Sequence, residues 1–190
     1  MTQFAYNLPI FLTLVRLVTA PLIIPVLCVL YLPANSFKLN LLVALLFVSF
    51  CLTDFLDGYL ARKYKQETVI GRLLDPLADK FLLFSSLIGL VYIHKIFYFW
   101  AIIFIGREFF IMGLREVALY FGFTISVSPL GKLKTIAQQA YITAVILNHA
   151  GNIALLENIL LVGALFLTVY SAWDYALEFR KTWLKKSREI

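Results

Sequence analysis

The sequence predicts an all-α, polytopic membrane protein with six transmembrane helices, in a single domain that covers residues 1–190. The chain is 62% hydrophobic and 15% charged, whereas a soluble domain is closer to half apolar and a quarter charged. Its mean hydropathy is +0.87. Six apolar stretches, each close to the ~20 residues that a helix needs to cross a bilayer, follow one another with short polar breaks between them.

The predicted helices are connected by breaks that alternate between two sides of the membrane. The helices cover residues 8–32, 39–60, 75–93, 97–121, 133–150 and 159–179. The breaks on one side are LPANSFK (32–38), HK (94–95) and GNIALLEN (151–158). Those on the other side are RKYKQETVIGR (62–72), TISVSPLGK (124–132) and the tail from Arg180. The sequence shows no internal repeat, and no basic region typical of a removable signal peptide precedes the first helix.

Basic residues gather on one side of the predicted bundle. Twelve of the 17 lie there: Arg62, Lys63, Lys65, Arg72, Lys80, Lys132, Lys134, Arg180, Lys181, Lys185, Lys186 and Arg188. The opposite side carries only Lys38 and Lys95. Because basic loops favour the cytoplasmic side of a membrane, we expect both termini at that face. The net charge of +6 then reports topology, so we expect no nucleic-acid partner and interpret the basic tail as an anchor on membrane lipids.

Cysteine and histidine give no sign of a redox or metal site. Cys28 and Cys51 lie in apolar stretches without a spacing typical of metal binding or of disulfides, so we interpret them as packing residues. His94 and His149 lie singly near predicted turns, where an interfacial role is the simpler interpretation.

The segment richest in chemistry is DFLDGYLARKYKQETVIGRLLDPLADK, residues 54–80. The chain has 11 acidic residues, and four of them are aspartates of this segment: Asp54, Asp57, Asp75 and Asp79. The spacing within each pair places both residues on one face of a helix. The turn between the two predicted helices makes them antiparallel, so we expect the four carboxylates to converge in a cleft open to the cytoplasmic face.

Four carboxylates at membrane depth need compensation, because an uncompensated charge there costs several kcal/mol. Hard divalent cations take carboxylate oxygens as ligands. Two such ions would neutralise the site and hold the reacting oxygens of a phosphoryl transfer. Gly58, Ala61 and Gly71 lie on the same faces, where small residues let a ligand approach closely. The alternative is a salt-bridge network between the aspartates and the basic residues of the segment.

The type and spacing of eight residues resemble the signature of the CDP-alcohol phosphatidyltransferase family: Asp54, Asp57, Gly58, Ala61, Arg62, Gly71, Asp75 and Asp79. The resemblance implies a homodimeric six-helix enzyme in which the hydroxyl of an alcohol displaces CMP from a CDP-linked lipid. It implies Mg²⁺ or Mn²⁺, as two ions, with the four aspartates as ligands and Asp79 also as the catalytic base. It implies a CDP-diacylglycerol site formed by Gly58, Ala61, Arg62, Thr68 and Gly71.

The predicted fourth helix carries four charged residues in an apolar stretch, GREFFIMGLREVALY: Arg107, Glu108, Arg115 and Glu116. Arg107 and Arg115 are about two turns apart, on roughly one face. Lys132 and Lys134 stand at the start of the fifth helix, where free N–H groups also attract anions. These extra cations predict an acceptor alcohol that brings its own phosphate. The alternative is that each arginine pairs with the neighbouring glutamate and only orients the helix.

Three further segments, NLPIFLTLVR, GREF…LRE and GKLKT, resemble the family members that use sn-glycerol 3-phosphate. This resemblance implies phosphatidylglycerophosphate and CMP as products, in the bacterial inner membrane. Ile10 departs from that group, where asparagine or threonine is frequent. Asn7, Thr13 and Arg16 lie near the cytoplasmic start of the first helix. Contacts to nucleotide or head group are one interpretation of them, and helix capping by Asn7 or snorkelling by Arg16 is the other.

Other functions stay open. The same motif serves another phosphorylated acceptor, such as inositol phosphate. A small cation transporter would place its acids near the bilayer midplane, on broken helices or in repeated halves, whereas these acids cluster at one face of a chain without repeats. A metal-dependent prenyltransferase is disfavoured by the single two-helix motif.

Overall fold

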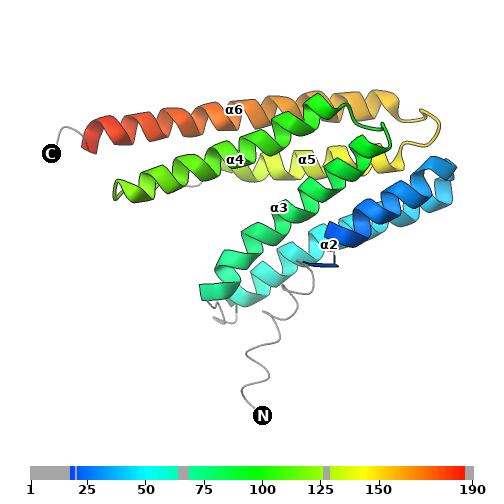
Figure 1. The fold of residues 1–190 in the computed structure, drawn as a ribbon, viewed down its shortest axis with the longest axis horizontal. Helices are drawn as coiled ribbons and strands as arrows, with labels where there is room; N and C mark the ends of the chain where they lie inside the picture. The colour runs from blue at the N-terminus through cyan, green and yellow to red at the C-terminus, as the bar shows by residue number, and fades with distance from the viewer. Residues whose placement is uncertain (1–17, 20, 64–68, 126–128, 187–190) are drawn as a thin grey trace, which may run out of the picture. The chain divides into compact units, whose positions relative to one another are not determined.

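The computed structural model describes the backbone of residues 18–19, 21–63, 69–125 and 129–186, and their side chains except at 54–63, 69–79 and 129. In these residues the chain is helical without any strand, so the all-α class is confirmed (Figure 1). A first helix covers Pro21–Ala34 and ends in the 3-10 turn η1 (Leu32–Ala34). The other helices are α2 (Phe37–Lys63), α3 (Val69–Tyr92), α4 (Tyr98–Tyr120), α5 (Pro129–Leu147) and α6 (Ala154–Lys186).

The helices agree with the predicted spans but extend beyond several of them. α2 and α4 match closely, whereas α3 and α5 begin earlier than predicted and α6 is longer at both ends. The predicted spans follow apolar content, which reports bilayer thickness, and a helix continues into polar turns wherever its backbone bonds can form. α5 begins at Pro129, in agreement with the preference of proline for the first turn of a helix.

Among the described residues, one helix is long and apolar enough to cross a membrane, Ala154–Lys186. Shorter apolar helices cover Pro21–Ala34, Phe37–Thr53 and Lys80–Tyr92. α4 has 23 residues, but its apolar sequence is interrupted by four charged side chains. Six membrane crossings therefore stay a prediction.

The chain divides into two compact units. Unit 1 comprises Met1–Phe97 and Ile142–Ala154, and unit 2 comprises Tyr98–Tyr141 and Leu155–Ile190. α2 and α3 belong to unit 1, α4 and nearly all of α6 belong to unit 2, and α5 contributes to both. The aspartate segment is thus in unit 1, and the predicted phosphate-binding cations are in unit 2.

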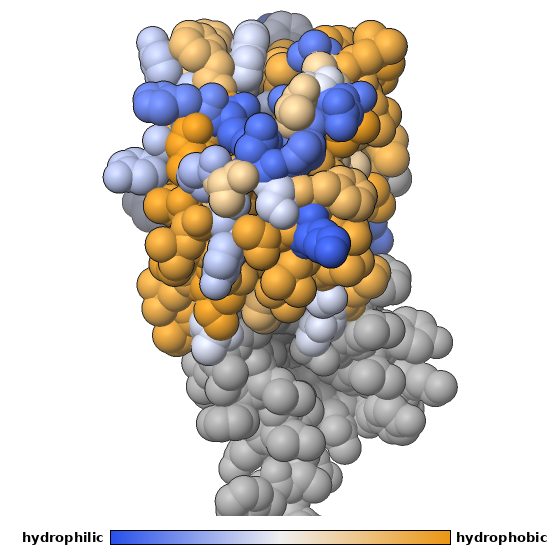
Figure 2. Space-filling model, turned by 90° about the vertical axis from the view of Figure 1, so that its right-hand side faces the viewer, coloured by the Kyte–Doolittle hydropathy of each residue, from blue (hydrophilic) through white to orange (hydrophobic). Residues whose placement is uncertain are grey.

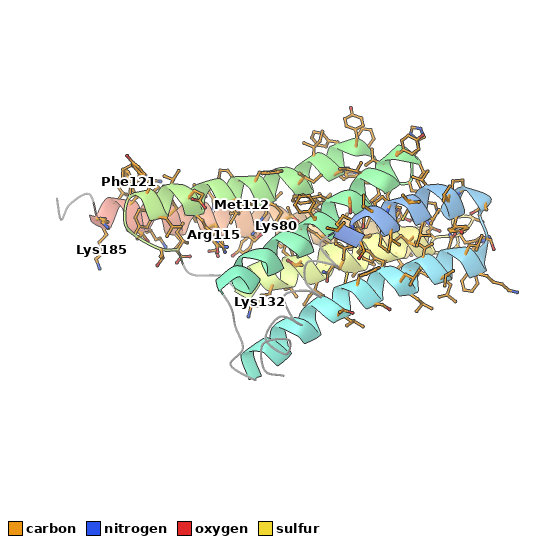
Figure 3. The ribbon with its side chains drawn as sticks, turned by 60° about the horizontal axis from the view of Figure 1, so that its bottom comes forward. Lys80, Met112, Arg115, Phe121, Lys132 and Lys185 are labelled. Atoms are coloured by element: carbon orange, nitrogen blue, oxygen red, sulfur yellow. The ribbon has the colours of Figure 1, made fainter. Side chains whose placement is uncertain are left out.

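In unit 1, α2 packs against α3, and their ends next to the connection 64–68 lie side by side (Figures 1 and 3). Gly89 of α3 lies against the first helix, where an added Cβ would come within 3.0 Å of the Pro25 Cα. Lys95 Nζ donates to the backbone carbonyl of Asn148 at 2.7 Å. This bond satisfies a carbonyl just after α5 with a cation, as is typical of helix C-termini.

The turns of unit 1 form a polar end. Asn35, His94 and Ala150 have positive φ angles of 51°, 58° and 52°, which end the helices before them. The N–H of Ala150 donates to Asn35 Oδ1 at 3.3 Å, so the turn after the first helix contacts the turn after α5. Figure 2 views the molecule from the side of these turns and shows a band of hydrophilic residues in the upper part of that face, with hydrophobic residues over most of the remaining coloured surface.

In unit 2, α4 and α6 run in the same direction and α5 runs opposite to them (Figure 1). The turn after α4 is attached to the end of α6. Lys186 Nζ donates to the Gly122 carbonyl at 2.7 Å, and the Trp183 ring meets the Phe121 ring edge-on, with centroids 4.3 Å apart. Gly122 has a φ of 71°, a left-handed conformation that glycine adopts without strain.

The outer face of α6 is apolar. Exposed large side chains recur at helical spacing along it: Leu155, Ile159, Val162, Phe166, Val169 and Trp173. The opposite face of α6 is buried at the same spacing by Ala164, Thr168, Ser171 and Tyr175. Exposed apolar surface of this extent is atypical of a protein in water and marks a membrane or protein contact.

Candidate active site

The aspartate segment lies on the adjoining ends of α2 and α3. Asp54 and Asp57 belong to α2 (Phe37–Lys63), and Asp75 and Asp79 belong to α3 (Val69–Tyr92). The helical backbone that the sequence predicts under each pair is therefore confirmed. The side chains of residues 54–79 are outside the described ones, so the convergence of the carboxylates stays a prediction.

The predicted CDP-diacylglycerol site stays a prediction for the same reason. Gly58, Ala61 and Arg62 lie on the backbone of α2, and Gly71 lies on that of α3. Thr68 is in the connection 64–68, outside the described residues. The possible nucleotide or head-group contacts also lie outside them: Asn7, Thr13 and Arg16.

The donor chemistry of the aspartate segment fits divalent metal ions. Two helices that pack against each other carry two carboxylates each, and carboxylate oxygens are the ligands that Mg²⁺ and Mn²⁺ prefer. Among the residues with described side chains, no group of three or more His, Cys, Asp or Glu could hold a metal ion. The fit therefore rests on the donor set of the aspartate segment alone.

Unit 2 contains a cluster of polar side chains in its interior, which we call the buried polar cluster. Its members come from α4, α5 and α6: Arg107, Glu108, Lys134, Gln138, Thr168 and Ser171. Glu108 lies on the buried stripe of α4 that also contains Ala101, Phe104, Ile111 and Ala118. The cluster thus occupies positions that apolar side chains fill elsewhere along the same helices.

The carboxylate of Glu108 joins two cations of this cluster. Arg107 Nη1 donates to Glu108 Oε1 at 3.0 Å, and Lys134 Nζ donates to the same oxygen. The side chains of Arg107 and Glu108 are each 8% exposed, and that of Lys134 is 3% exposed. Removal of one partner from such a buried pair leaves an uncompensated charge and typically costs about 3–5 kcal/mol.

The rest of the cluster connects these charges to α6. Arg107 Nη2 donates to Ser171 Oγ at 3.0 Å, and Gln138 Nε2 donates to Thr168 Oγ1 at 3.0 Å. Within the described part of the chain, Arg107 Nε and Gln138 Oε1 are buried and have no hydrogen-bond partner. Buried polar atoms are nearly always paired, so these two atoms are exceptions within the cluster.

The two remaining predicted cations are exposed. Arg115 Nη2 donates to the hydroxyl of Tyr175 at 2.6 Å, and the guanidinium carbon lies 5.4 Å from the centroid of the Tyr175 ring. Lys132 extends from the first turns of α5 (Figure 3). Both residues are accessible to solvent, and Tyr175 orients the first of them through a hydrogen bond and a cation–π contact.

The structure thus bears on both interpretations of the charged residues of α4. The pairing of Arg107 with Glu108, expected under the alternative, is observed. The sequence did not predict the contact between Glu108 and Lys134. It also did not predict that Tyr175 contacts Arg115. Thr168, Ser171 and Tyr175 lie on the buried stripe of α6. Polar residues at positions of a helix that are otherwise apolar are the sequence signal by which these three residues could have been predicted.

The sequence profile of the CDP-alcohol phosphatidyltransferase family matches residues 6–170. The chain belongs to this family, whose members are membrane-associated enzymes. The resemblance that the eight-residue signature indicates is therefore confirmed, and the match includes residues of both units.

Several relatives bear one name, CDP-diacylglycerol–glycerol-3-phosphate 3-phosphatidyltransferase. The chain is 36% identical to the protein of Rickettsia bellii over 173 residues, which are 89% of this chain and 93% of that relative. It is 37% identical to the Haemophilus influenzae protein over 174 residues, 90% and 91% of the two chains. For the Bacillus subtilis protein the identity is 38% over 143 residues, 74% and 72% of the two chains.

Proposed function

We propose that this protein transfers the phosphatidyl group of CDP-diacylglycerol to sn-glycerol 3-phosphate and releases CMP. The observation that carries the proposal is the similarity, over most of the chain, to relatives named for this reaction. The aspartate signature supports the transfer chemistry. The cations of unit 2 support an acceptor that carries a phosphate.

The reaction exchanges one phosphorus–oxygen bond for another. The acceptor's hydroxyl oxygen forms a bond to the phosphorus that carries diacylglycerol. The bond from that phosphorus to the oxygen shared with CMP breaks, and CMP leaves with the electron pair. Asp79 takes the proton of the attacking hydroxyl, which gives phosphatidylglycerophosphate as the product.

The aspartate segment would hold Mg²⁺ or Mn²⁺, as two ions, through Asp54, Asp57, Asp75 and Asp79. When bound, these ions supply charge neutralisation at the diphosphate oxygens. Arg62 donates paired hydrogen bonds to the diphosphate, as guanidinium groups do to phosphates, and Thr68 contacts the nucleotide. Gly58, Ala61 and Gly71 leave room for CDP-diacylglycerol next to the helices.

The acceptor's phosphate would bind to Arg107, Arg115, Lys132 and Lys134. The guanidinium of Arg107 retains a buried N–H group, Nε, without a partner among the described residues. Arg115 and Lys132 are exposed and thus accessible to a ligand from solution. Glu108 cancels one of the two buried cations, so the Arg107–Glu108–Lys134 group has a net charge of +1 and attracts an anion.

The proposed location is the bacterial inner membrane, with six crossings, both termini in the cytoplasm, and a homodimer as the family resemblance implies. The apolar outer face of α6 and the asymmetric distribution of basic residues support this placement. Because glycerol 3-phosphate is a charged, water-soluble substrate, its binding site must open to an aqueous face of the membrane.

The decisive experiment is an acceptor screen with the purified full-length protein. CDP-diacylglycerol is offered together with glycerol 3-phosphate, inositol phosphate, glycerol or serine, and released CMP is measured. We expect release with glycerol 3-phosphate, its loss on addition of a chelator, and its return with Mg²⁺ or Mn²⁺. A variant with Asp54→Asn and Asp57→Asn controls for contaminating activity.

Any other outcome would contradict one specific part of the proposal. Release with inositol phosphate but not with glycerol 3-phosphate would establish the other acceptor. Full activity after exhaustive metal removal would refute the metal site. No release with any acceptor would refute the transferase function of the purified protein.

A further inference from the structure

We infer that Glu108 is a positioning residue for the acceptor's phosphate, because it holds Arg107 and Lys134 together from two different helices. The inference rests on the proposed function and assigns a role to an acidic residue where the ligand is itself an anion. Glu108 itself does not contact the acceptor. It acts through the two cations.

The contacts show that one carboxylate oxygen serves both cations. Glu108 Oε1 accepts from Arg107 Nη1 at 3.0 Å and from Lys134 Nζ, whose residue is 26 positions further along the chain. Arg107 is held in addition by Ser171 of α6, 64 positions away. The carboxylate therefore determines how a cation of α4 and a cation of α5 stand relative to each other.

The charge balance explains why an acid belongs next to a phosphate site. Without Glu108, two cations would lie buried beside each other, and buried like charges repel and lose their hydration. Lys134 and Arg107 would then repel each other, and Arg107 would keep Ser171 as a neutral partner. With Glu108 both cations are held at one carboxylate oxygen, in a fixed arrangement to which the acceptor's phosphate can bind.

The position of Glu108 also distinguishes it from the other acid of the same helix. Glu108 lies on the buried stripe of α4. Glu116, about two turns further along, is exposed. The two residues have the same side chain and the same arginine-preceded sequence, so Glu116→Gln is a matched control for Glu108→Gln.

The test compares Glu108→Gln, Glu108→Asp and Glu116→Gln in the full-length protein, with separate KM values for glycerol 3-phosphate and CDP-diacylglycerol. For Glu108→Gln we expect the KM for glycerol 3-phosphate to rise about tenfold or more, as for loss of a charge-assisted hydrogen bond. The KM for CDP-diacylglycerol and the kcat should change less than about twofold, because neither depends on the two cations. Glu116→Gln should match the unmodified protein, and Glu108→Asp should fall between it and Glu108→Gln.

The outcomes separate this inference from the proposed function. If the unmodified protein releases no CMP with glycerol 3-phosphate, the proposed function fails before any variant is compared. If that protein is active and Glu108→Gln leaves the KM for glycerol 3-phosphate unchanged, or lowers it, positioning is overturned. An equal rise in both KM values would also overturn it and assign Glu108 to the fold.

The charge-preserving variant keeps the inference testable if Glu108→Gln does not fold, as judged by gel filtration and thermal unfolding. Glu108→Asp retains the carboxylate but draws it back by one methylene group, so it can no longer reach both cations equally well. We then expect a selective rise of several-fold in the KM for glycerol 3-phosphate. An unchanged KM in this variant would overturn the inference.

Discussion

The aspartate segment and the buried polar cluster are two ways of placing charge inside an apolar chain. The segment is short, and each of its acidic pairs lies within about one turn of a single helix. The cluster draws on three helices, through contacts between residues 26 to 64 positions apart. A site of the first kind can be recognised from the spacing of its residues along the chain. A site of the second kind exists only after the helices have packed.

The largest effect on activity is expected for a substitution in the aspartate segment. Asp79→Asn should reduce turnover by roughly 10²–10⁴-fold, the usual contribution of a general base, and more if a metal ligand is lost with it. Binding of CDP-diacylglycerol should largely survive, because most of the site is unchanged. CMP release measures the first quantity, and titration with the lipid nucleotide measures the second. Asp174→Asn, on α6, serves as the control, and retained turnover in Asp79→Asn would remove the base role.

A smaller and more selective effect is expected in unit 2. Arg115→Ala should raise the KM for glycerol 3-phosphate roughly tenfold, since one charge-assisted contact to the phosphate is lost, with little change for CDP-diacylglycerol. Tyr175→Phe removes only the hydroxyl that accepts from Arg115 and keeps the ring beneath the guanidinium. We therefore expect a rise of only a few-fold in that variant.

Steady-state kinetics with each substrate varied in turn would show whether the aspartate segment binds CDP-diacylglycerol and the cations of unit 2 bind glycerol 3-phosphate. Equal losses for both substrates in Arg115→Ala would mean that Arg115 serves the fold. The aspartate segment would then have a catalytic role and Arg115 a structural one. The two regions would no longer differ in which substrate, CDP-diacylglycerol or glycerol 3-phosphate, they bind.

The apolar stretches of the sequence predicted an all-α chain, and the predicted order of helices is confirmed for α2 to α6. The sequence predicted their ends less well, as at α6, where the helix continues to Lys186 through a polar, basic stretch. For the site, local spacing led to the family through the signature at residues 54–79. Each of these inferences used residues that are neighbours along the chain.

The partners of the charged residues of α4 could not be predicted in the same way. Arg107 stands beside Glu108 in sequence, and their pairing was expected as one alternative. Nothing in the local pattern, however, indicates that Glu108 also meets Lys134 on α5, or that Arg107 meets Ser171 on α6. These contacts depend on the rotation of each helix about its axis, which is set by packing of the buried stripes.

The smallest expected effect tests whether changes in unit 2 act on the acceptor or only on stability. Gly122→Ala forces a side chain into a left-handed turn with a φ of 71°, and its Cβ would come within 3.0 Å of Lys186 Nζ. We expect a loss of about 1 kcal/mol, the usual cost of a residue other than glycine in this conformation, with a fall of about 2–4 °C in the Tm.

Gly113→Ala is the matched control for Gly122→Ala. Gly113 lies inside α4 with nothing within 4 Å of an added Cβ, and alanine is the better helix former by about 1 kcal/mol. Its Tm should stay equal or rise. Both variants should keep the KM for glycerol 3-phosphate, because neither touches the buried polar cluster. A raised KM in Gly122→Ala would show that destabilisation of unit 2 is enough to weaken acceptor binding. A raised KM in Glu108→Gln would then not be evidence that Glu108 positions the two cations.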